Sequence, residues 1–463
     1  MLCEKSRLAD ALRRFYSSNA YFAVCILLAS ASVVFNYEIA AAAIMIVLLA
    51  AQFFVQRDCS KMFYPILFMI VTLVNIMGED IQRASWLVLG IVPIFAGIIY
   101  NIVVYKKKFR KNKIFLPMLA TSAAVTAGGL FSISAEEYFE IGNMYYIVFL
   151  GFGMTALCAV LYTLWDGEDV KKLQYEFIRA VCDAGIFLGA VMLLYYLLNL
   201  NEFTKTHQLL EILADNPFRN VAVCFYLLSM PFAFFCSRKK QVYILGGILI
   251  FVACLISGSR MGLLFGTAEF LICMVYLIAI SKRKLLNGIL FAVLIVAVFF
   301  MSDEVLYLYL GRGVEIGDGF INLGESRIEL MRRSVADFFS SPVFGKGLGY
   351  TGNEDCYKPE LFEMNWYHNF ICQIVGSLGI VGIVAYVYQF YVRLDLLLNR
   401  TTSFGWLIFL MYVGVLMSGI TDTGIFAPFP TVFLMNTAFM LVALEHEGFG
   451  KTPVYETNVV KKI

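Results

Sequence analysis

The chain has 463 residues, of which 60% are hydrophobic and 15% are charged. Soluble globular proteins are about half apolar and about a quarter charged, so a soluble globular chain is excluded. The 36 Lys and Arg residues are nearly balanced by 34 Asp and Glu residues. The chain therefore lacks the large basic excess with which proteins bind nucleic acids.

Apolar segments close to the length of a bilayer span follow one another along most of the chain. Hydropathy, interrupted at charged and turn-rich stretches, predicts about fourteen transmembrane helices. Their approximate cores are 20–35, 39–55, 62–77, 86–104, 114–131, 143–164, 180–199, 220–236, 241–257, 261–280, 285–301, 368–391, 404–420 and 427–443. We expect an all-α integral membrane protein that forms one polytopic domain over residues 1–463.

The charges of the loops predict the orientation of these helices. With a cytoplasmic N-terminus, the cytoplasmic segments hold roughly 26 of the 36 Lys and Arg residues, and the short outer loops hold only about four. Both termini are therefore expected in the cytoplasm, with 445–463 as a tail. The first apolar segment is long enough to span the bilayer, and we expect it to remain as an anchor in the inner or plasma membrane.

The cysteines and histidines predict neither a disulfide framework nor a metal site. Most of the eleven cysteines lie inside apolar segments, where they act as small hydrophobic residues. The three histidines, His207, His368 and His446, have no metal-ligand neighbour such as H-E-x-x-H or C-x-x-C. We expect no metal and no cofactor.

One loop, 302–366, is far longer than the others and is predicted to lie outside. Within it, Ser326 to Glu329 is a capping-box pattern, and apolar residues then recur at helical spacing. These are Ile328, Met331, Val335, Phe338 and Phe339. They predict an amphipathic helix over 327–340, whose apolar stripe faces lipid or the transmembrane bundle. Gly345, Gly347 and Gly349 follow Pro342 and predict a flexible turn.

The arginines of this helix differ in their neighbours along the chain. Arg333 has Glu329 one turn before it and Asp337 one turn after it, which favours an ion-pair ladder on a solvated face. Arg327 and Arg332 lack such partners at the same spacing. Arg332 falls at the edge of the apolar stripe, where it faces either lipid headgroups or an anionic ligand.

Arg260 lies in the motif S-G-S-R-M-G between two strongly apolar segments, at the predicted outer surface. A cation at this depth either extends to the lipid phosphates or binds the diphosphate of a lipid-linked ligand. The planar guanidinium matches the phosphate oxygens of such a ligand.

His368 lies where the long loop enters the next helix, in the motif W-Y-H-N-F. It is either a structural hydrogen-bonding residue or a general base, for which its ordinary pKa is suitable. Acidic residues occur in the outer loops, and solvated loop charge is their simplest interpretation. Asp422, in I-T-D-T-G near a helix end, is also a candidate to orient an acceptor.

Together these motifs resemble the O-antigen ligase and O-antigen polymerase superfamily. The matching features are S-G-S-Arg260-M-G, Arg327 with Met331 after three residues, P-V-F-Gly345-K-Gly347-L-G, His368-Asn369 followed by Gly379, and Gly128-Gly129 before an acidic loop. The resemblance is best over about residues 250–390. Family members often have an aromatic residue at the position of Met331.

The resemblance implies a glycosyltransferase with many transmembrane helices and a long outer loop that closes over the site. Its donor would be a glycan on undecaprenyl diphosphate, and its acceptor another glycan or a lipid-linked glycan. Arg260 and Arg327, with Arg332, would bind the diphosphate, and His368 would be the general base. Gly345, Gly347 and Asn369 would support the loop. The reaction would invert the anomeric carbon and need no metal.

Functions of three classes remain as alternatives at this point, namely a glycan-transferring enzyme, a flippase, and a sensor or scaffold. A polymerase of O-antigen, capsule or exopolysaccharide repeat units is the broadest interpretation, with a chain-length regulator as a possible partner, and a ligase that transfers polysaccharide to the lipid A core shares the same motifs. A flippase for lipid-linked oligosaccharides would instead place its charged residues at mid-membrane depth. A sensor or scaffold would bind a protein partner through the outer loop.

Overall fold

The computed structural model describes most of the chain, with gaps at both ends and in several loops. The described residues are 7–35, 37–74, 85–132, 135–140, 143–198, 219–257, 259–281, 283–300, 319–350, 366–422 and 424–449. They form helices joined by turns, without a β-strand among them. The predicted all-α fold class is therefore confirmed for the described residues.

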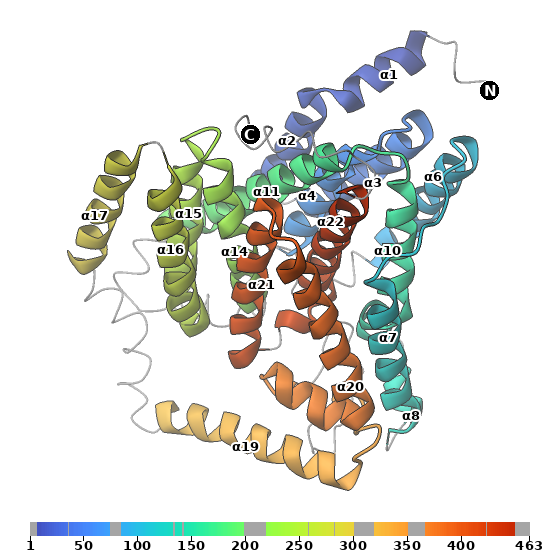
Figure 1. Cartoon of the computed structure of the whole chain (residues 1–463), viewed down its shortest axis with the longest axis vertical. Helices are drawn as coiled ribbons and strands as arrows, with labels where there is room; N and C mark the ends of the chain where they lie inside the picture. The colour runs from blue at the N-terminus through green and yellow to red at the C-terminus, as the bar shows by residue number, and fades with distance from the viewer. Residues whose placement is uncertain are drawn as a thin grey trace. The chain divides into compact units, whose positions relative to one another are not determined.

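The helices follow the apolar segments of the sequence (Figure 1). They are α1 (Arg7–Ser17), α2 (Asn19–Phe35), α3 (Glu38–Val55), α4 (Phe63–Val74), α6 (Ile91–Val104), α7 (Phe115–Leu130), α8 (Ala135–Tyr138), α9 (Met144–Leu150), α10 (Phe152–Leu164), α11 (Val170–Leu198), α14 (Arg219–Cys236), α15 (Tyr243–Ile256), α16 (Arg260–Ile280), α17 (Lys284–Phe300), α19 (Gly319–Ser340), α20 (Phe370–Asn399), α21 (Ser403–Thr421) and α22 (Phe433–Phe449). Short helical turns occupy Ser60–Met62, Ser85–Gly90, Gly424–Phe426 and Pro428–Val432.

Several of these helices are long and apolar enough to cross a membrane. Among the described residues there are six, or eight if each of two bent helix pairs counts as one span, and shorter apolar helices accompany them. Each of the predicted span cores coincides with one of these helices, bent pairs or shorter apolar helices. The chain is thus a multi-pass membrane protein, and the count of fourteen spans stays a prediction.

The described chain divides into two compact units. Unit 1 comprises 1–112, 156–184 and 440–462, and unit 2 comprises 113–155 and 185–439. Helices α10, α11 and α22 contribute residues to both. The expectation of one polytopic domain stays a prediction, as does the cytoplasmic tail, of which α22 includes residues 445–449.

Polar contacts in unit 1 join segments that the charge pattern places on one side of the membrane. They pair Gln56 with the carbonyl of Arg13, Lys107 with Glu168, Lys171 with Glu445, and Lys172 with Asp58. These residues come from the N-terminal segment, three predicted cytoplasmic loops and the predicted tail. Alternation of the spans requires such segments to lie at one end of the unit. Which side of the membrane that end faces stays a prediction.

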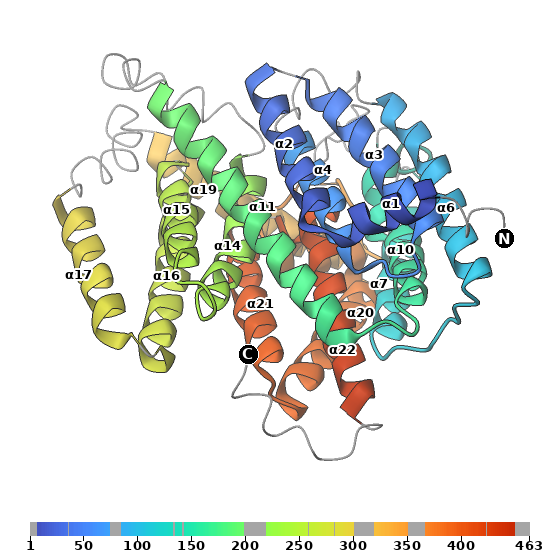
Figure 2. The same cartoon turned by 90° about the horizontal axis from the view of Figure 1, so that it is seen from above.

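Unit 2 is built around α14 and α20. Helix α14 packs against α15, α16 and α21, while α20 packs against α7 and α19. Helix α17 contacts α16 and lies at the edge of the unit (Figure 2). Its side chains Leu285, Ile289 and Val293 are exposed, as expected for a helix that faces lipid.

A break in α20 at Gly379 shapes the end of unit 2 where α19 lies. Gly379 has φ 59° and ψ −154°, a conformation that essentially only glycine adopts. The loop after α19 fills the break. The backbone N–H groups of Lys346 and Gly347 donate to Gly376 and Ser377 at 3.0 and 2.9 Å. In return, Ile380 and Val381 donate to Pro342 and Val343.

The glycines of this region allow its backbones to approach closely. A Cβ on Gly345, which has φ 73°, would lie 2.2 Å from the carbonyl carbon of Ser377. A Cβ on Gly128 of α7 would lie 3.2 Å from the Ser377 oxygen and 3.3 Å from the Phe344 oxygen. The glycine motif after Pro342 is therefore a packed loop, and the prediction of a flexible turn is wrong.

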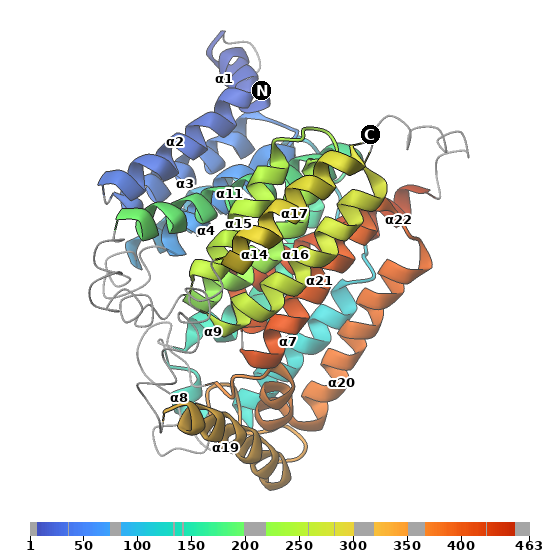
Figure 3. The same cartoon turned by 90° about the vertical axis from the view of Figure 1, so that its left-hand side faces the viewer.

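Helix α19 crosses the end of unit 2 beside the start of α20 (Figures 1 and 3). It begins at Gly319, eight residues before the predicted start, because the helix continues through the capping-box pattern at Ser326. Its end at Ser340 agrees with the prediction. The rest of the long loop, 302–318 and 351–365, lies outside the described residues.

The face that α19 turns toward α20 is polar. The Ser334 hydroxyl donates to the carbonyl of Cys372 at 2.8 Å, and the buried Tyr367 hydroxyl donates to Asp337. Burial raises the pKa of the Asp337 carboxyl. Most of the predicted apolar stripe is exposed instead, namely Ile328, Met331, Val335 and Phe339. These four residues do not pack on the bundle, and their contact with lipid stays a prediction.

Candidate functional site

The candidate site lies where α20 begins and α21 ends, and Asn369 joins these two helix ends. Its Oδ1 accepts hydrogen bonds from the backbone N–H groups of Ile371 and Cys372, at 2.9 and 3.1 Å, and so caps α20. Its Nδ2 donates to the carbonyl of Ile420 at 2.8 Å, near the end of α21. Asn369, predicted as a supporting residue, thus fixes the geometry around its neighbour His368.

His368 and Asp422 form a pair at this junction. Nδ1 of His368 lies 3.4 Å from Oδ1 of Asp422, and the side chains are 43% and 11% exposed. His368 has φ 51°, a left-handed conformation that is uncommon for residues other than glycine and that occurs often at functional sites. When Nδ1 carries the ring proton toward Asp422, Nε2 is free to accept a proton from another molecule.

The sequence alone left open which acidic residue would assist His368. The structure selects Asp422, which is 54 positions away along the chain. The sequence feature that could have indicated Asp422 was its position in I-T-D-T-G, directly after a predicted span. Its predicted role in orienting an acceptor stays a prediction, because the observed contact is to the imidazole.

Arg327 reaches the same junction from α19. Its Nη1 donates to the carbonyl of Thr421 at 3.0 Å, next to Asp422 in the chain. A cation that binds the last carbonyls of a helix also interacts favourably with the helix dipole, which is a purely structural role. The guanidinium has five N–H donors, and among the described residues this is its one hydrogen bond. Its remaining donors are exposed and face solvent or a ligand.

Arg332 is directed away from Arg327. Five helical residues correspond to a rotation of about 140°, so the two side chains leave α19 on different faces. Arg332 is 77% exposed and lies 3.9 Å from Glu329. Glu329 precedes Arg332 by three residues, so this contact does not contradict the predicted absence of a partner at a spacing of four. Arg333 pairs with Glu329 as predicted, at 3.4 Å, whereas Asp337 accepts from Tyr367.

Arg260 is the first residue of α16, and its side chain lies outside what the structure describes. Its motif forms the tight connection between α15 and α16. Ser257 Oγ donates to the carbonyl of Cys254 at 2.7 Å and accepts from the N–H of Ser259 at 3.2 Å. A Cβ on Gly262 would lie 2.8 Å from the Cys254 oxygen, so this glycine permits the close approach.

Helix α14 contacts both the start of α16 and the end of α21. Its residue Val223 faces Gly262, where a Cβ would lie 3.3 Å from the valine methyl group. The next residue, Cys224, has its sulfur 3.6 Å from Ser418 Oγ, one turn before Asp422. The backbone of Arg260 is thus placed at the same end of unit 2 as the His368–Asp422 pair.

No group of three or more His, Cys, Asp or Glu side chains arranged to bind a metal occurs among the described residues. The chemistry that this arrangement offers by itself is proton transfer at His368 beside exposed arginine donors. Such a combination is suited to a reaction in which a hydroxyl nucleophile attacks carbon and displaces a phosphate or diphosphate leaving group.

Comparison with known proteins matches a segment that contains part of this site. Residues 245–387 match the O-antigen ligase family model. The match includes every residue that the sequence predicted for the site, and Asp422 lies beyond it. Neither the curated proteins nor the solved structures gave a match to the chain. Members of the matched family are glycosyltransferase-type enzymes. The match over residues 245–387 supports the resemblance to the O-antigen ligase and O-antigen polymerase superfamily and a role in glycan transfer at a membrane.

Proposed function

We propose that the protein transfers a glycan from undecaprenyl diphosphate to a hydroxyl of an acceptor glycan, and that it polymerises the repeat units of a surface polysaccharide. The observation that carries this proposal is the His368–Asp422 pair, with Arg327 bound at the adjacent Thr421. A proton acceptor and a cation with free donors are the two groups that the reaction needs.

His368 is the general base in this proposal. Nε2 removes the proton from the acceptor hydroxyl while its oxygen attacks the anomeric carbon of the donor. The bond between the anomeric carbon and the diphosphate oxygen breaks, and undecaprenyl diphosphate leaves with the bonding electrons. Attack opposite the leaving group inverts the anomeric carbon. Asp422 holds the imidazole and stabilises its protonated form, and a base of this kind contributes about 10²–10⁴-fold to the rate.

The arginines stabilise the leaving group. Negative charge grows on the diphosphate as the bond breaks, and fixed guanidinium donors stabilise that charge. Arg327 has the free donors for this role, and Arg260 starts α16 at the same end of unit 2. Arg332 would contribute only through the exposed face of α19. Because these cations neutralise the diphosphate, we expect the reaction to proceed without a metal.

An O-antigen ligase is the second candidate, because the matched family model is described by that name. A ligase would use the same donor and the same base, with the lipid A core as acceptor. The two functions differ in the acceptor and not in the chemistry at His368. A chain-length regulator is an expected partner of the polymerase only.

The test is an assay of the purified full-length protein in lipid, with a repeat unit linked to undecaprenyl diphosphate as substrate and with EDTA present. The variants are His368→Ala, Asp422→Asn and Arg327→Ala. His446→Gln is the matched control, since His446 is a histidine of α22 in unit 1. Products are separated by the number of repeat units.

Longer glycans from the wild type and the control, with loss of product in the three variants, would support the polymerase. Transfer only when lipid A core is supplied would favour the ligase. Movement of the substrate across the bilayer without a new glycosidic bond would refute the enzyme and favour a flippase. Full activity of His368→Ala would refute the proposed base.

A further inference from the structure

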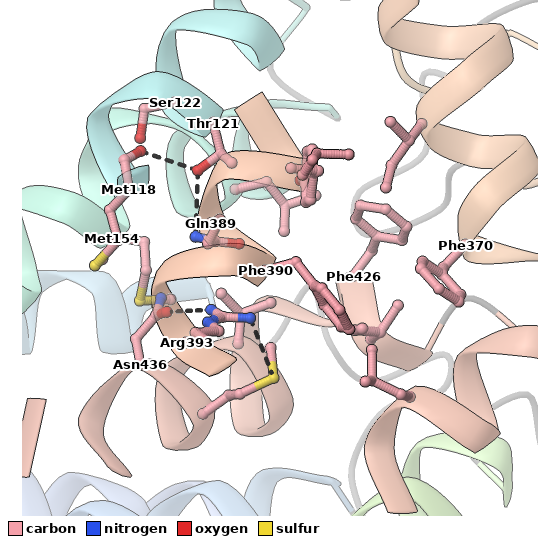
Figure 4. Close-up of a pocket in the computed structure, with 18 of the residues that line it drawn as sticks. Met118, Thr121, Ser122, Met154, Phe370, Gln389, Phe390, Arg393, Phe426 and Asn436 are labelled. Atoms are coloured by element: carbon pink, nitrogen blue, oxygen red, sulfur yellow. Dashed lines mark hydrogen bonds between the residues drawn. The ribbon is translucent and has the colours of Figure 1, made fainter. Parts of the chain in front are cut away.

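A cavity of about 370 Å³ lies inside unit 2, and His368, Asp422 and Arg327 do not line it. Its wall comes from α7, α9, α10, α20, α21, α22 and the turns before α22 (Figure 4). Apolar and aromatic side chains make up most of this wall, among them Ile374, Phe390 and Phe426. A wall of this composition fits a hydrocarbon chain.

The cavity opens toward the outside of unit 2 along α20. Ile371, Val387 and Phe390 line it and are also exposed, by 54%, 61% and 40%. All three belong to a helix long and apolar enough to cross a membrane. A molecule in the bilayer therefore has access to the cavity from the side.

One part of the wall is polar (Figure 4). It includes Arg393 and Gln389 on α20, Thr121 and Ser122 on α7, and Asn436 on α22. Gln389 Nε2 donates to Thr121 Oγ1 at 3.5 Å. The sequence alone places Arg393 among the positive residues at the cytoplasmic end of a span and gives no sign of a site.

Arg393 is a buried cation with neutral partners. It is 5% exposed, and its Nη2 donates to Oδ1 of Asn436 at 2.8 Å. Its Nη1 lies 3.6 Å from the sulfur of Met435, and the guanidinium lies over the rings of Tyr412 and Phe439. Among the described residues no carboxylate pairs with it.

Such an arrangement leaves a charge without a counter-charge. A buried cation in a membrane-spanning helix costs several kcal/mol unless an anion or a full set of hydrogen bonds accompanies it. The contacts to Asn436 and the two rings supply part of that stabilisation. The remaining guanidinium donors have no acceptor among the described residues, and they border the cavity.

Arg393 is also well separated from the proposed site of glycan transfer. It follows the break at Gly379 by fourteen residues, which is roughly 20 Å of helix. The donor diphosphate belongs beside His368 and Arg327, at the start of α20. An anion bound at Arg393 would therefore belong to a different molecule.

We propose that this cavity binds a second lipid, a long-chain amphiphile with one anionic group, separate from the glycan donor. The anionic group, a carboxylate or a phosphate, binds Arg393 and the carboxamide of Gln389. The hydrocarbon chain lies along the apolar wall toward Phe370 and Phe426. The guanidinium fork matches both kinds of anion, so a fatty acid and an anionic phospholipid share the required chemistry.

Native mass spectrometry of the full-length protein in neutral detergent tests this proposal. The probes are oleate, oleyl alcohol, 1-oleoyl-lysophosphatidate and dioleoylphosphatidylglycerol. We expect one-to-one binding of oleate at concentrations at least about tenfold lower than oleyl alcohol, because a charged hydrogen bond contributes 1.4 kcal/mol or more. The two phosphate lipids distinguish a single-chain ligand from a two-chain ligand.

Two kinds of variant distinguish the contribution of the Arg393 charge from that of the cavity volume. Arg393→Gln should remove the preference for oleate, and Arg393→Lys should keep part of it. Arg400→Gln, which removes an exposed cation near the end of the same helix, is the matched control. Ile383→Trp fills the cavity and should weaken oleate and oleyl alcohol equally. Because Ile383→Trp leaves Arg393 in place, it still tests whether lipids bind in this cavity if Arg393→Gln does not fold.

Equal binding of oleate and oleyl alcohol to the wild type would overturn the proposal. So would a preference for oleate that survives in Arg393→Gln, or one that Arg400→Gln removes as well. Loss of thermal stability in Arg393→Gln, together with no lipid adduct on the wild type, would show that Arg393 has only a structural role. Because no glycan is transferred in these measurements, their result is independent of the proposed function.

Discussion

The break in α20 offers the most direct test of how the fold supports the site. Gly379→Ala places a Cβ 2.7 Å from three backbone atoms, the nitrogen of Gly345 and the oxygens of Pro342 and Val343. Backbone atoms cannot move aside as the end of a flexible side chain can. The substitution should therefore push the loop that follows α19 away from α20. We expect this movement also to displace His368 and Asn369, which lie at the start of α20.

The size of the effect follows from two contributions. Alanine at the φ and ψ of Gly379 costs about 1–3 kcal/mol, and an added methyl group in a packed region costs about 1–3 kcal/mol more. We expect a total of about 2–6 kcal/mol, which is a large part of the 5–15 kcal/mol that usually stabilises a domain. Gly288→Ala in α17 is the control, since its Cβ would meet nothing within 4 Å.

Thermal unfolding of the full-length protein in detergent measures the effect. Gly379→Ala should melt at least about 5 °C below the wild type, and Gly288→Ala should melt at or slightly above it because alanine favours helix. Glycan transfer by Gly379→Ala should fall as well, measured below its melting temperature. If the two variants melt within about 1 °C of each other, the interlocked loop does not stabilise the break.

Three further predictions concern single polar contacts. Asp422→Asn should lower glycan transfer by about 100-fold or more while donor binding is unchanged, because an amide does not stabilise protonated His368; equal turnover would show that His368 acts without it. Burial raises the pKa of Asp337 above that of the unfolded chain, so the stability contributed by its protonated form is lost as pH rises above about 4. Asp337→Asn keeps an acceptor for Tyr367 and should therefore melt above the wild type at pH 7, with a difference that shrinks toward pH 4; a difference independent of pH would contradict this. Lys107→Met removes the buried donor to a carboxylate whose side chain is 11% exposed and should lower the free energy of unfolding by about 3–5 kcal/mol; unchanged melting would mean that the ion pair does not stabilise unit 1.

Much of the fold follows from properties that are local in the chain. Apolar segments of bilayer length predicted the helices, because hydropathy and length are read from consecutive residues. The start of α19 was misplaced for the same reason. Ser326 and Glu329 have the spacing of a helix start, yet the chain is already helical from Gly319 onward. A local pattern does not show whether the preceding residues continue the helix.

The hydrophobic pattern of α19 also did not predict which of its residues contact α20. The apolar stripe was expected to face either lipid or the bundle, and the residues of α19 that are buried against α20 are the polar Ser334 and Asp337. Two buried polar side chains are stable there because Cys372 and Tyr367 supply their hydrogen bonds. Partners of that kind are properties of the assembled fold.

For the site, too, some features follow from the sequence and others only from the tertiary structure. The sequence by itself determined the class of protein, and it predicted His368, Arg260 and Arg327 as site residues at the outer end of the spans. Only the tertiary structure decided that His368 meets Asp422 across 54 positions and that Arg327 meets Thr421 across 94. The physical reason is that hydropathy acts within each span, whereas these contacts depend on how α19, α20 and α21 pack at one end of unit 2.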